Sequence, residues 1–384
     1  MKDKMAKLIE ITGKALSGEW GNDDNTGNGI PVLRTTNFTN EGIVNYNNVV
    51  TRIIEKKKIE EKYLRKGDIV IEKSGGSDKQ PVGRVVYFDG PENTYLFNNF
   101  TGLLRVKDQA KWYPRYVFYS LFSNYHRGGT RAFQNKTTGL HNLKIDDFVS
   151  RCEVTEAGIN EQIAACKRMD RVNDIIRMHQ QQLQKLDELV KARFVELFGD
   201  PATNPYGWQQ LTVNDVCVSV VRGPFGSALK KEFFVPPSDT TYKVYEQKHA
   251  IQKSSTIGTY YVTAEKYNEL RRFECHSGDI LMSCSGTMGE LYQLPAGCER
   301  GIINQALCKF TLNERILPIV FLAYMRETIG NLETKGSGIQ NIAAVSYVKA
   351  MPINLPPMRV QEQFAAFVEQ TDKSKLCGKM EVAA

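Results

Sequence analysis

The chain has 384 residues, a net charge of +7 and 41% hydrophobic residues. This length exceeds what one hydrophobic core normally organises, so we expect two or three domains. The composition is that of an ordinary globular protein. No apolar run is long enough to cross a membrane or to act as a signal peptide, so we expect a cytoplasmic protein without a membrane partner.

Basic residues are concentrated in the first half. Residues 1–158 contain 24 Lys+Arg and 19 Asp+Glu, against 15 and 14 in residues 199–357. The segment 127–144, "RGGTRAFQNKTTGLHNLK", has four basic residues and no acidic one. Such a cluster suits the phosphates of a nucleic acid, although a solvated loop also explains it when it is considered alone.

The pattern of the eight cysteines argues against a disulfide-stabilised protein and against a zinc-binding protein. They are scattered, with no CxxC pair and no Cys/His cluster at the spacing of zinc ligands, so we expect reduced thiols and no metal site.

Short strands dominate the first part of the chain. Apolar runs that end at Gly, Asn or Pro turns predict them. The clearest runs are residues 29–38, 67–73, 83–88 and 101–106. A short amphipathic helix is predicted at 113–125.

A long helix is predicted at residues 159–198. This segment has no Pro or Gly and stops at the sequence Gly199-Asp200-Pro201. Forty helical residues span about 60 Å, too long for one small domain. A heptad pattern on this helix predicts pairing with a second helix; its positions are Val172, Ile176, His179, Leu183, Leu186 and Val190.

The second half repeats the first. Three segment pairs recur in the same order: "KTTGLHNL" (136–143) with "KGSGIQNI" (335–342) at an offset of 199, "KGDIVIEKSGG" (66–76) with "SGDILMSCSGT" (277–287) at 211, and "INEQIAA" (159–165) with "VQEQFAA" (360–366) at 201. Order and nearly constant offset indicate a tandem duplication. The second copy also predicts a short helix, at 317–329.

A second long helix is predicted after "LPPM", at residues 358–376, with residues 377–384 as a tail. Val360, Phe364, Phe367 and Thr371 continue the heptad pattern. With the offset of 201, Val172 corresponds to Lys373, so we expect the second helix to end where the pattern of the first begins.

These motifs together resemble type I restriction–modification specificity subunits. The resemblance rests on the duplication, the "GDI…SG" turns, "KGSGIQNI" leading to "LPPMRVQEQFAAFVEQ", "RGPFGSALKKEFF" (222–234) and the helix ending "ELFGDP". It covers essentially the whole chain. The sequence departs from the family in its short second helix and in "VTEAG" (154–158), which replaces the "LPP" entry in the first copy.

The resemblance implies an α/β (α+β) fold with two target recognition domains, each with an irregular sheet and a following long helix. The expected domains are residues 1–158 and 199–357, and the helices at 159–198 and 358–376 would pair antiparallel as a coiled-coil spacer. Each domain would read one half of a bipartite sequence in double-stranded DNA.

The resemblance also implies that this chain is not an enzyme. Two methyltransferase subunits would use S-adenosylmethionine to methylate adenine, and restriction subunits would use ATP and Mg. The specificity subunit itself is expected to bind no cofactor.

The repeated octapeptide supplies the first DNA-binding candidates. Lys136 and Lys335 are cations of the kind that bind phosphate. Gly139 and Gly338 allow close approach of the backbone, and the hydroxyls of neighbouring residues can donate to phosphate oxygens; these are Thr137, Thr138 and Ser337, with Gln340 alongside. Asn142 and Asn341 would either read an adenine edge or cap a helix.

Further candidates lie at predicted strand ends and in the basic segment; they are Arg34, Asn37, Lys73, Ser74, Arg84 and Arg131 in the first copy, and Lys230, Ser285 and Thr287 in the second. Asp68 and Asp279 are interpreted as turn residues rather than catalytic acids.

Two other classes remain to be weighed. A stand-alone methyltransferase would need an Asn/Asp-Pro-Pro-aromatic motif, and the nearest match, "NPYGW" (204–208), lacks the second Pro. Nuclease-type Glu-x-Lys triplets at 55–57 and 333–335 lack paired acids. A scaffold that binds the methyltransferase through its helices, without placing both domains on DNA, is the second alternative.

The phosphate assignment of Lys136 is testable. Lys136→Ala should weaken binding to all duplex sequences alike and lower the slope of log K against log salt by about 1, because the variant neutralises one phosphate fewer. Fluorescence anisotropy with several unrelated duplexes measures both quantities. A change in which bases are preferred would contradict the assignment.

Overall fold

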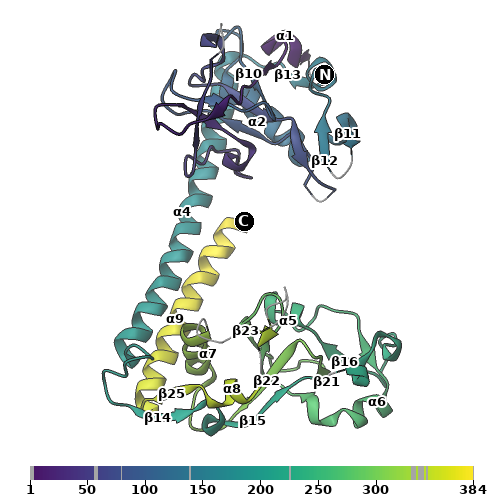
Figure 1. Ribbon diagram of the computed structural model, residues 1–384, viewed down its shortest axis with the longest axis vertical. Helices are drawn as coiled ribbons and strands as arrows, with labels where there is room; N and C mark the ends of the chain where they lie inside the picture. The colour runs from purple at the N-terminus through teal and green to yellow at the C-terminus, as the bar shows by residue number, and fades with distance from the viewer. Residues whose placement is uncertain are drawn as a thin grey trace. The chain divides into compact units, whose positions relative to one another are not determined.

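The computed structural model describes residues 4–55, 59–78, 80–137, 140–224, 226–329, 334–335, 341–342 and 345–383. The chain forms two compact units, Met1–Ile175 and Ile176–Ala384 (Figure 1). Helix α4 (Ile159–Phe198) begins in the first unit and ends in the second, with the bounds that the sequence predicts.

The first unit is built on two four-stranded sheets. One has the order β2 (Leu16–Ser17), β10 (Thr101–Leu104), β6 (Ile69–Glu72) and β8 (Val85–Tyr87), with all neighbours antiparallel. The other has the order β3 (Asn22–Asp23), β5 (Val50–Ile53), β4 (Ile30–Leu33) and β9 (Leu96–Phe97), in which β4 and β9 are parallel.

Smaller elements complete this unit. Strand β1 (Met5–Lys7) pairs with β13 (Glu153–Thr155), and β7 (Ser74–Gly76) joins the hairpin of β11 (Gln134–Thr137) and β12 (Leu140–Leu143). The helices are α1 (Leu8–Thr12), α2 (Pro114–His126) and α3 (Ile145–Arg151).

The apolar run of β6 is buried on both faces. Ile69 and Ile71 pack into a core with Leu8, Phe118 and other residues of the helices, whereas Val70 packs into a separate core with residues of the second sheet. Successive side chains of a strand point to opposite faces, so a strand between two cores is apolar at every position. This explains the continuous run "IVI" after Gly67-Asp68.

The second unit is likewise built on two four-stranded sheets. Its first sheet has the order β15 (Cys217–Arg222), β22 (Leu307–Leu312), β19 (Ile280–Ser283) and β20 (Leu291–Gln293). Its second sheet has the order β17 (Tyr261–Val262), β16 (Tyr242–Tyr245), β21 (Gly301–Ile303) and β18 (Glu274–Cys275), and β16 pairs with β21 in parallel, as β4 does with β9.

The remaining strands of this unit are two pairs, β14 (Gln209–Thr212) with β25 (Pro352–Leu355), and β23 (Thr334–Lys335) with β24 (Asn341–Ile342). Its helices after α4 are α5 (Gln247–Ile251), α6 (Ala264–Glu269), α7 (Pro318–Thr328), α8 (Val345–Ala350) and α9 (Met358–Ala383). Proline at the first turn starts both α2 and α7, within one residue of the predicted starts.

Two glycines show how closely the repeats correspond. A Cβ at Gly18 would lie 2.1 Å from the carbonyl oxygen of Asn98, and a Cβ at Gly223 would lie 1.9 Å from that of Asn304. Only glycine permits this contact between backbones. The duplication and the predicted fold class, two repeated domains of mixed helix and sheet with a long helix, are confirmed.

A buried glutamine fixes the first turn of each long helix. Gln162 accepts from the backbone N–H of Tyr113 (2.9 Å) and donates to the carbonyls of Lys111 (3.0 Å) and Ala157 (2.8 Å). Gln361 makes the same three bonds, with Leu317 (2.9 Å), Arg315 (2.9 Å) and Pro356 (3.0 Å). Both glutamines are 1% exposed.

These bonds correct the alignment of the two helices. The sequence match placed Gln162 opposite Gln363, at an offset of 201, but the structure equates it with Gln361, at an offset of 199. The starts of α4 and α9 agree with 199. The sequence alignment matched Glu161-Gln162 with Glu362-Gln363 because the residues are identical. Identical residues do not show which glutamine is buried.

The predicted end of the second helix is wrong. Helix α9 does not stop near Leu376 but continues to Ala383, so residues 377–383 are helical rather than a tail. A single glycine, Gly378, costs a helix about 1 kcal/mol relative to alanine and does not end it. No proline follows Pro357 in this sequence.

Helices α4 and α9 pack antiparallel within the second unit (Figure 1). The ring of Phe364 lies 5.8 Å from Phe194 and 5.2 Å from Phe198, whereas the Lys375 ammonium forms a 2.7 Å ion pair with Asp187. Residue numbers therefore rise along α9 as they fall along α4, which is the antiparallel arrangement that the family resemblance implies.

The heptad positions differ in burial. Phe364 is fully buried, and Val190 and Val360 pack against the same core. Leu183, Leu186 and Phe367 are half-buried, and the Arg193 guanidinium lies 5.8 Å from the Phe367 ring. Val172 and Ile176, which the same pattern includes, are instead 51% and 36% exposed.

In the described part of the chain, no helix is both long and apolar enough to cross a membrane. The same residues contain no group of three or more His, Cys, Asp or Glu side chains that could hold a metal ion.

The glutamine bonds predict a large and local effect on stability. Gln361→Ala should lower the free energy of unfolding by about 3 kcal/mol, because three buried backbone groups lose their partner. Gln363→Ala is the matched control on the exposed side of the same helix turn and should change it by less than about 0.5 kcal/mol. Urea unfolding measures both. Equal effects would contradict the corrected alignment.

Candidate nucleic-acid interface

The structure brings two of the predicted motifs of the first copy into one sheet. The described residues of the octapeptide lie in the antiparallel strands β11 and β12, the hairpin strands, in which Lys136 pairs with His141. Strand β7, from the "KSGG" turn, pairs along β12, with Asn142 opposite Ser74 and His141 opposite Gly76. The backbone N–H of Leu143 also donates to the Lys73 carbonyl at 2.8 Å. Lys136, Asn142, Lys73 and Ser74 therefore belong to one local structure.

Glycines make this sheet possible. Gly75 has φ of +118°, a conformation that residues with a side chain rarely adopt, and a Cβ on Gly76 would lie 2.4 Å from the Val82 nitrogen. The segment after β7 consequently folds back against the hairpin. There the His141 ring contacts Gln134 Oε1 at 3.0 Å, and its Nε2 lies 3.6 Å from the Asp78 carboxylate.

The helix-cap interpretation of the two asparagines is wrong. Asn142 lies in β12, and the residue that precedes α3 is Lys144. Asn341 likewise lies in β24, before α8. Asn142 lies in the same sheet as Ser74, its partner in β7. For Asn142 and Asn341 the other prediction, that each reads an adenine edge, stays a prediction.

Basic side chains line a cavity beside this sheet. Its volume is about 490 Å³, and its lining includes Gln80, His126, Arg127 and Arg131. Both arginines are part of the basic segment that the sequence singles out. Arg131, which lies in the short 3-10 helix Arg131–Phe133, is exposed. Arg127 and His126 were not among the predicted site residues, although Arg127 opens that segment.

Lys73 is half-buried at the edge of the same region. Its ammonium donates to Ser17 Oγ at 2.6 Å, and burial lowers its pKa, with the nearby Lys62 ammonium adding to the effect. A partly desolvated ammonium beside a strand edge gains more from a phosphate than a fully hydrated one does.

Arg84 is committed to internal contacts. Its guanidinium donates to both carboxylate oxygens of Glu72 (3.0 and 3.2 Å) and to the carbonyls of Thr35 and Phe38. Burial alone would lower the pKa of Arg84, but the Glu72 carboxylate raises it above its usual value. This arginine holds β6 and β8 against the Thr35–Phe38 turn, which argues against the predicted DNA contact.

Asn37 and Arg34 also have structural roles. Asn37 is 2% exposed; its amide donates to Asn45 and Asn47, and its oxygen accepts from the Arg34 N–H at 3.0 Å. The Arg34 side chain donates to the Asn48 carbonyl at 3.0 Å. Sequence position at a strand end could not distinguish these internal bonds from contacts with a ligand.

Asp68 and Asp279 are turn residues, as interpreted from the sequence. Asp68 accepts from the Arg65 N–H at 2.7 Å, and Asp279 accepts from the His276 N–H at 2.8 Å. Each carboxylate is also paired with a cation, Asp68 with Arg105 directly after β10 and Asp279 with Lys309 of β22.

In the second copy, β23 and β24 hold the places of β11 and β12. Lys335 and Asn341 pair in the β23–β24 hairpin. Ser337, Gly338 and Gln340, like Thr138 and Gly139 of the first copy, lie outside the described residues.

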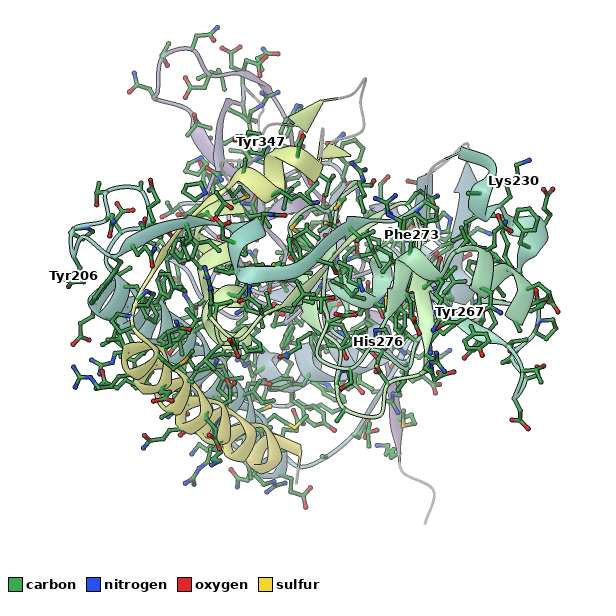
Figure 2. The ribbon with its side chains drawn as sticks, turned by 90° about the horizontal axis from the view of Figure 1, so that it is seen from below. Tyr206, Lys230, Tyr267, Phe273, His276 and Tyr347 are labelled. Carbon is green, nitrogen blue, oxygen red and sulfur yellow. The ribbon has the colours of Figure 1, made fainter. Side chains whose placement is uncertain are left out.

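The other candidates of the second copy lie in loops. Gln247 donates to the carbonyls of Ser285 and Thr287, which fixes the loop after β19. Lys230 is exposed, at the edge of the unit opposite Tyr206, and its ammonium lies 3.6 Å from Glu232 (Figure 2).

Comparison with known proteins assigns the family. The Type I restriction modification DNA specificity domain matches residues 4–188 and again 205–378. The chain therefore belongs to this family, and it is a DNA-recognition specificity protein. No curated protein sequence matches it.

Two solved structures share the fold over the whole chain. One is a structure described as the basis of complex assembly and conformational transition of the type I R-M system. It is 14% identical to this chain, with a TM-score of 0.59, and the match covers 100% of this chain and 93% of that chain. The other is the type I S subunit from M. genitalium, with 14% identity and a TM-score of 0.55, covering 100% and 92%.

The contacts separate arginines that stabilise the fold from arginines free to bind DNA. Arg84→Ala should lower the free energy of unfolding by about 3 kcal/mol, because the nearly buried Glu72 loses its partner. Arg131→Ala should leave stability unchanged and lower the salt slope of DNA binding by about 1. Urea unfolding and anisotropy titrations at several salt concentrations measure the two effects. The reverse pattern would contradict this division.

Proposed function

We propose that the chain is the sequence-reading subunit of a type I restriction–modification complex, in which each unit reads one half of a bipartite DNA target. The observation that carries the proposal is the duplication of a complete domain, with the hairpin and the buried glutamine in equivalent places. Two copies of one reading module fit a target with two parts.

The spacer helix sets the scale of the target. Helix α4 has 40 residues and a length of about 60 Å, which limits the separation of half-sites to roughly 18 base pairs at about 3.4 Å per pair. Phosphate contacts from lysine and arginine would fix the position on the duplex, and side chains such as Asn142 would read base edges.

The chemistry belongs to partners in this proposal. Two methyltransferase subunits that use S-adenosylmethionine would methylate adenine, and restriction subunits that use ATP and Mg would cleave; this chain would bind double-stranded DNA and no cofactor. The similar type I R-M structure concerns complex assembly, which supports the same role here.

The scaffold alternative is less well supported. It depended on a second helix too short to pair with the first. Helix α9 extends to Ala383, and its Phe364 and Lys375 contact α4 at two separated places.

Methylation mapping tests the proposal. The chain is co-expressed with its methyltransferase subunit, and methyl-adenine is mapped across the host DNA by long-read sequencing. A gapped motif with two different halves is expected. A symmetric motif built from one half would mean that one unit per chain reads DNA. No methylation from an assembled complex would favour the scaffold.

A further inference from the structure

A second basic cavity lies in the first unit, away from the hairpin sheet. It has a volume of about 500 Å³. Arg65 and Lys66 reach it from the turn before β6, Lys14 from the segment before β2, and Lys107 from the segment after β10. Lys73 and β7 follow the opposite end of β6, so the length of that strand, about 13 Å, separates the two regions.

The one carboxylate in the lining is already neutralised. Asp68 forms two hydrogen bonds with Arg105, from Nε at 2.7 Å and from Nη2 at 2.6 Å. The Arg105 guanidinium is held further by the carbonyls of Glu61 (3.0 Å) and Tyr63 (2.8 Å). This pair forms a rigid wall without net charge. The charge of the cavity therefore comes from the other cations.

Those four cations, Lys14, Arg65, Lys66 and Lys107, are exposed, and none forms an ion pair with another described residue. The backbone N–H of Lys107 donates to the Ile11 carbonyl at 3.0 Å. Its ammonium packs against Gly13, where a Cβ would lie only 2.6 Å from the Lys107 nitrogen. Four like charges around one cavity repel one another unless an anion lies among them.

The second copy supplies an internal comparison. Equivalent hydrogen bonds match the positions of the two copies. The Asn313 N–H donates to the Val216 carbonyl, as the Lys107 N–H donates to the Ile11 carbonyl. The His276 N–H donates to the Asp279 carboxylate, as the Arg65 N–H donates to the Asp68 carboxylate.

Lys14, Arg65, Lys66 and Lys107 thus correspond to Ser219, His276, Ser277 and Asn313. The His276 ring is moreover 3.2 Å from the Glu274 carboxylate, in the region of Tyr267 and Phe273 (Figure 2). The fold does not require the four cations, since the same backbone is built without them.

We propose that this cavity binds a phosphate group and that the site is specific to the first unit. Phosphate matches the charge, and the separate lysine and arginine donors can surround its oxygens. The phosphate belongs either to the backbone of a DNA duplex or to a small free ligand. In the first case the inference rests on the proposed function; in the second it does not.

The test uses the residues of the second copy as replacements. The full chain carrying K14S/K66S/K107N has the side chains that the same fold already accommodates at these positions. The control R151S/K167S/R171S removes the same charge from exposed residues of the first unit that do not line the cavity. Thermal unfolding without ligand verifies that both variants fold.

The first measurement is the salt dependence of binding to a duplex of about 40 base pairs. If the phosphate is that of DNA, K14S/K66S/K107N should lower the slope of log K against log salt by about 1, since each phosphate that the protein neutralises adds about 0.9 to that slope. The control should leave the slope unchanged.

The second measurement is the melting temperature with inorganic phosphate or chloride at equal ionic strength. If the ligand is free, phosphate should raise the Tm of the unsubstituted chain by roughly 3 °C at saturating concentration but not that of K14S/K66S/K107N. No difference between this variant and the control in either measurement overturns the proposal. Failure of the unsubstituted chain to bind any duplex contradicts the proposed function instead, and the phosphate measurement still decides the cavity.

Discussion

A single buried amide joins each recognition domain to its long helix. Gln162 and Gln361 each gather three backbone groups from two separate segments, and both do so at the first turn of the helix. Because a buried backbone group without a partner is costly, this arrangement fixes the direction in which the helix leaves the domain.

The two units combine one backbone with two distributions of charge. The strand order of the first sheet, the parallel strand pair of the second sheet and the positions of Gly18 and Gly223 are shared. The charges are not: the cavity of four cations in the first unit corresponds to serine, histidine and asparagine in the second. A duplicated scaffold that keeps its backbone can therefore acquire new ligands by exchanging exposed side chains alone.

The sequence predicted what depends on local chemistry. The bounds of α4 follow from a stretch without Pro or Gly and from a clear stop signal, and repetition revealed the domains. Long-range packing was not predictable. Arg84 and Asn37 look like ligand contacts until Glu72 and the Asn45 carbonyl are placed beside them. The sequence left a helix cap open as an alternative for Asn142, because its pairing with β7, about 70 residues earlier, leaves no local pattern.

The parallel strand pairs also constrain how the chain folds. Val32 of β4 pairs with Leu96 of β9, and Val244 of β16 pairs with Ile302 of β21, so each pairing closes a loop of roughly 60 residues. Such contacts form slowly, since the entropy of loop closure is lost before the pairing is gained. During synthesis the first strand of each parallel pair stays unpaired until its partner has left the ribosome. A strand from one repeat that meets the equivalent partner from the other would form a misassembled chain, so completion of the first repeat before the second is made protects the protein.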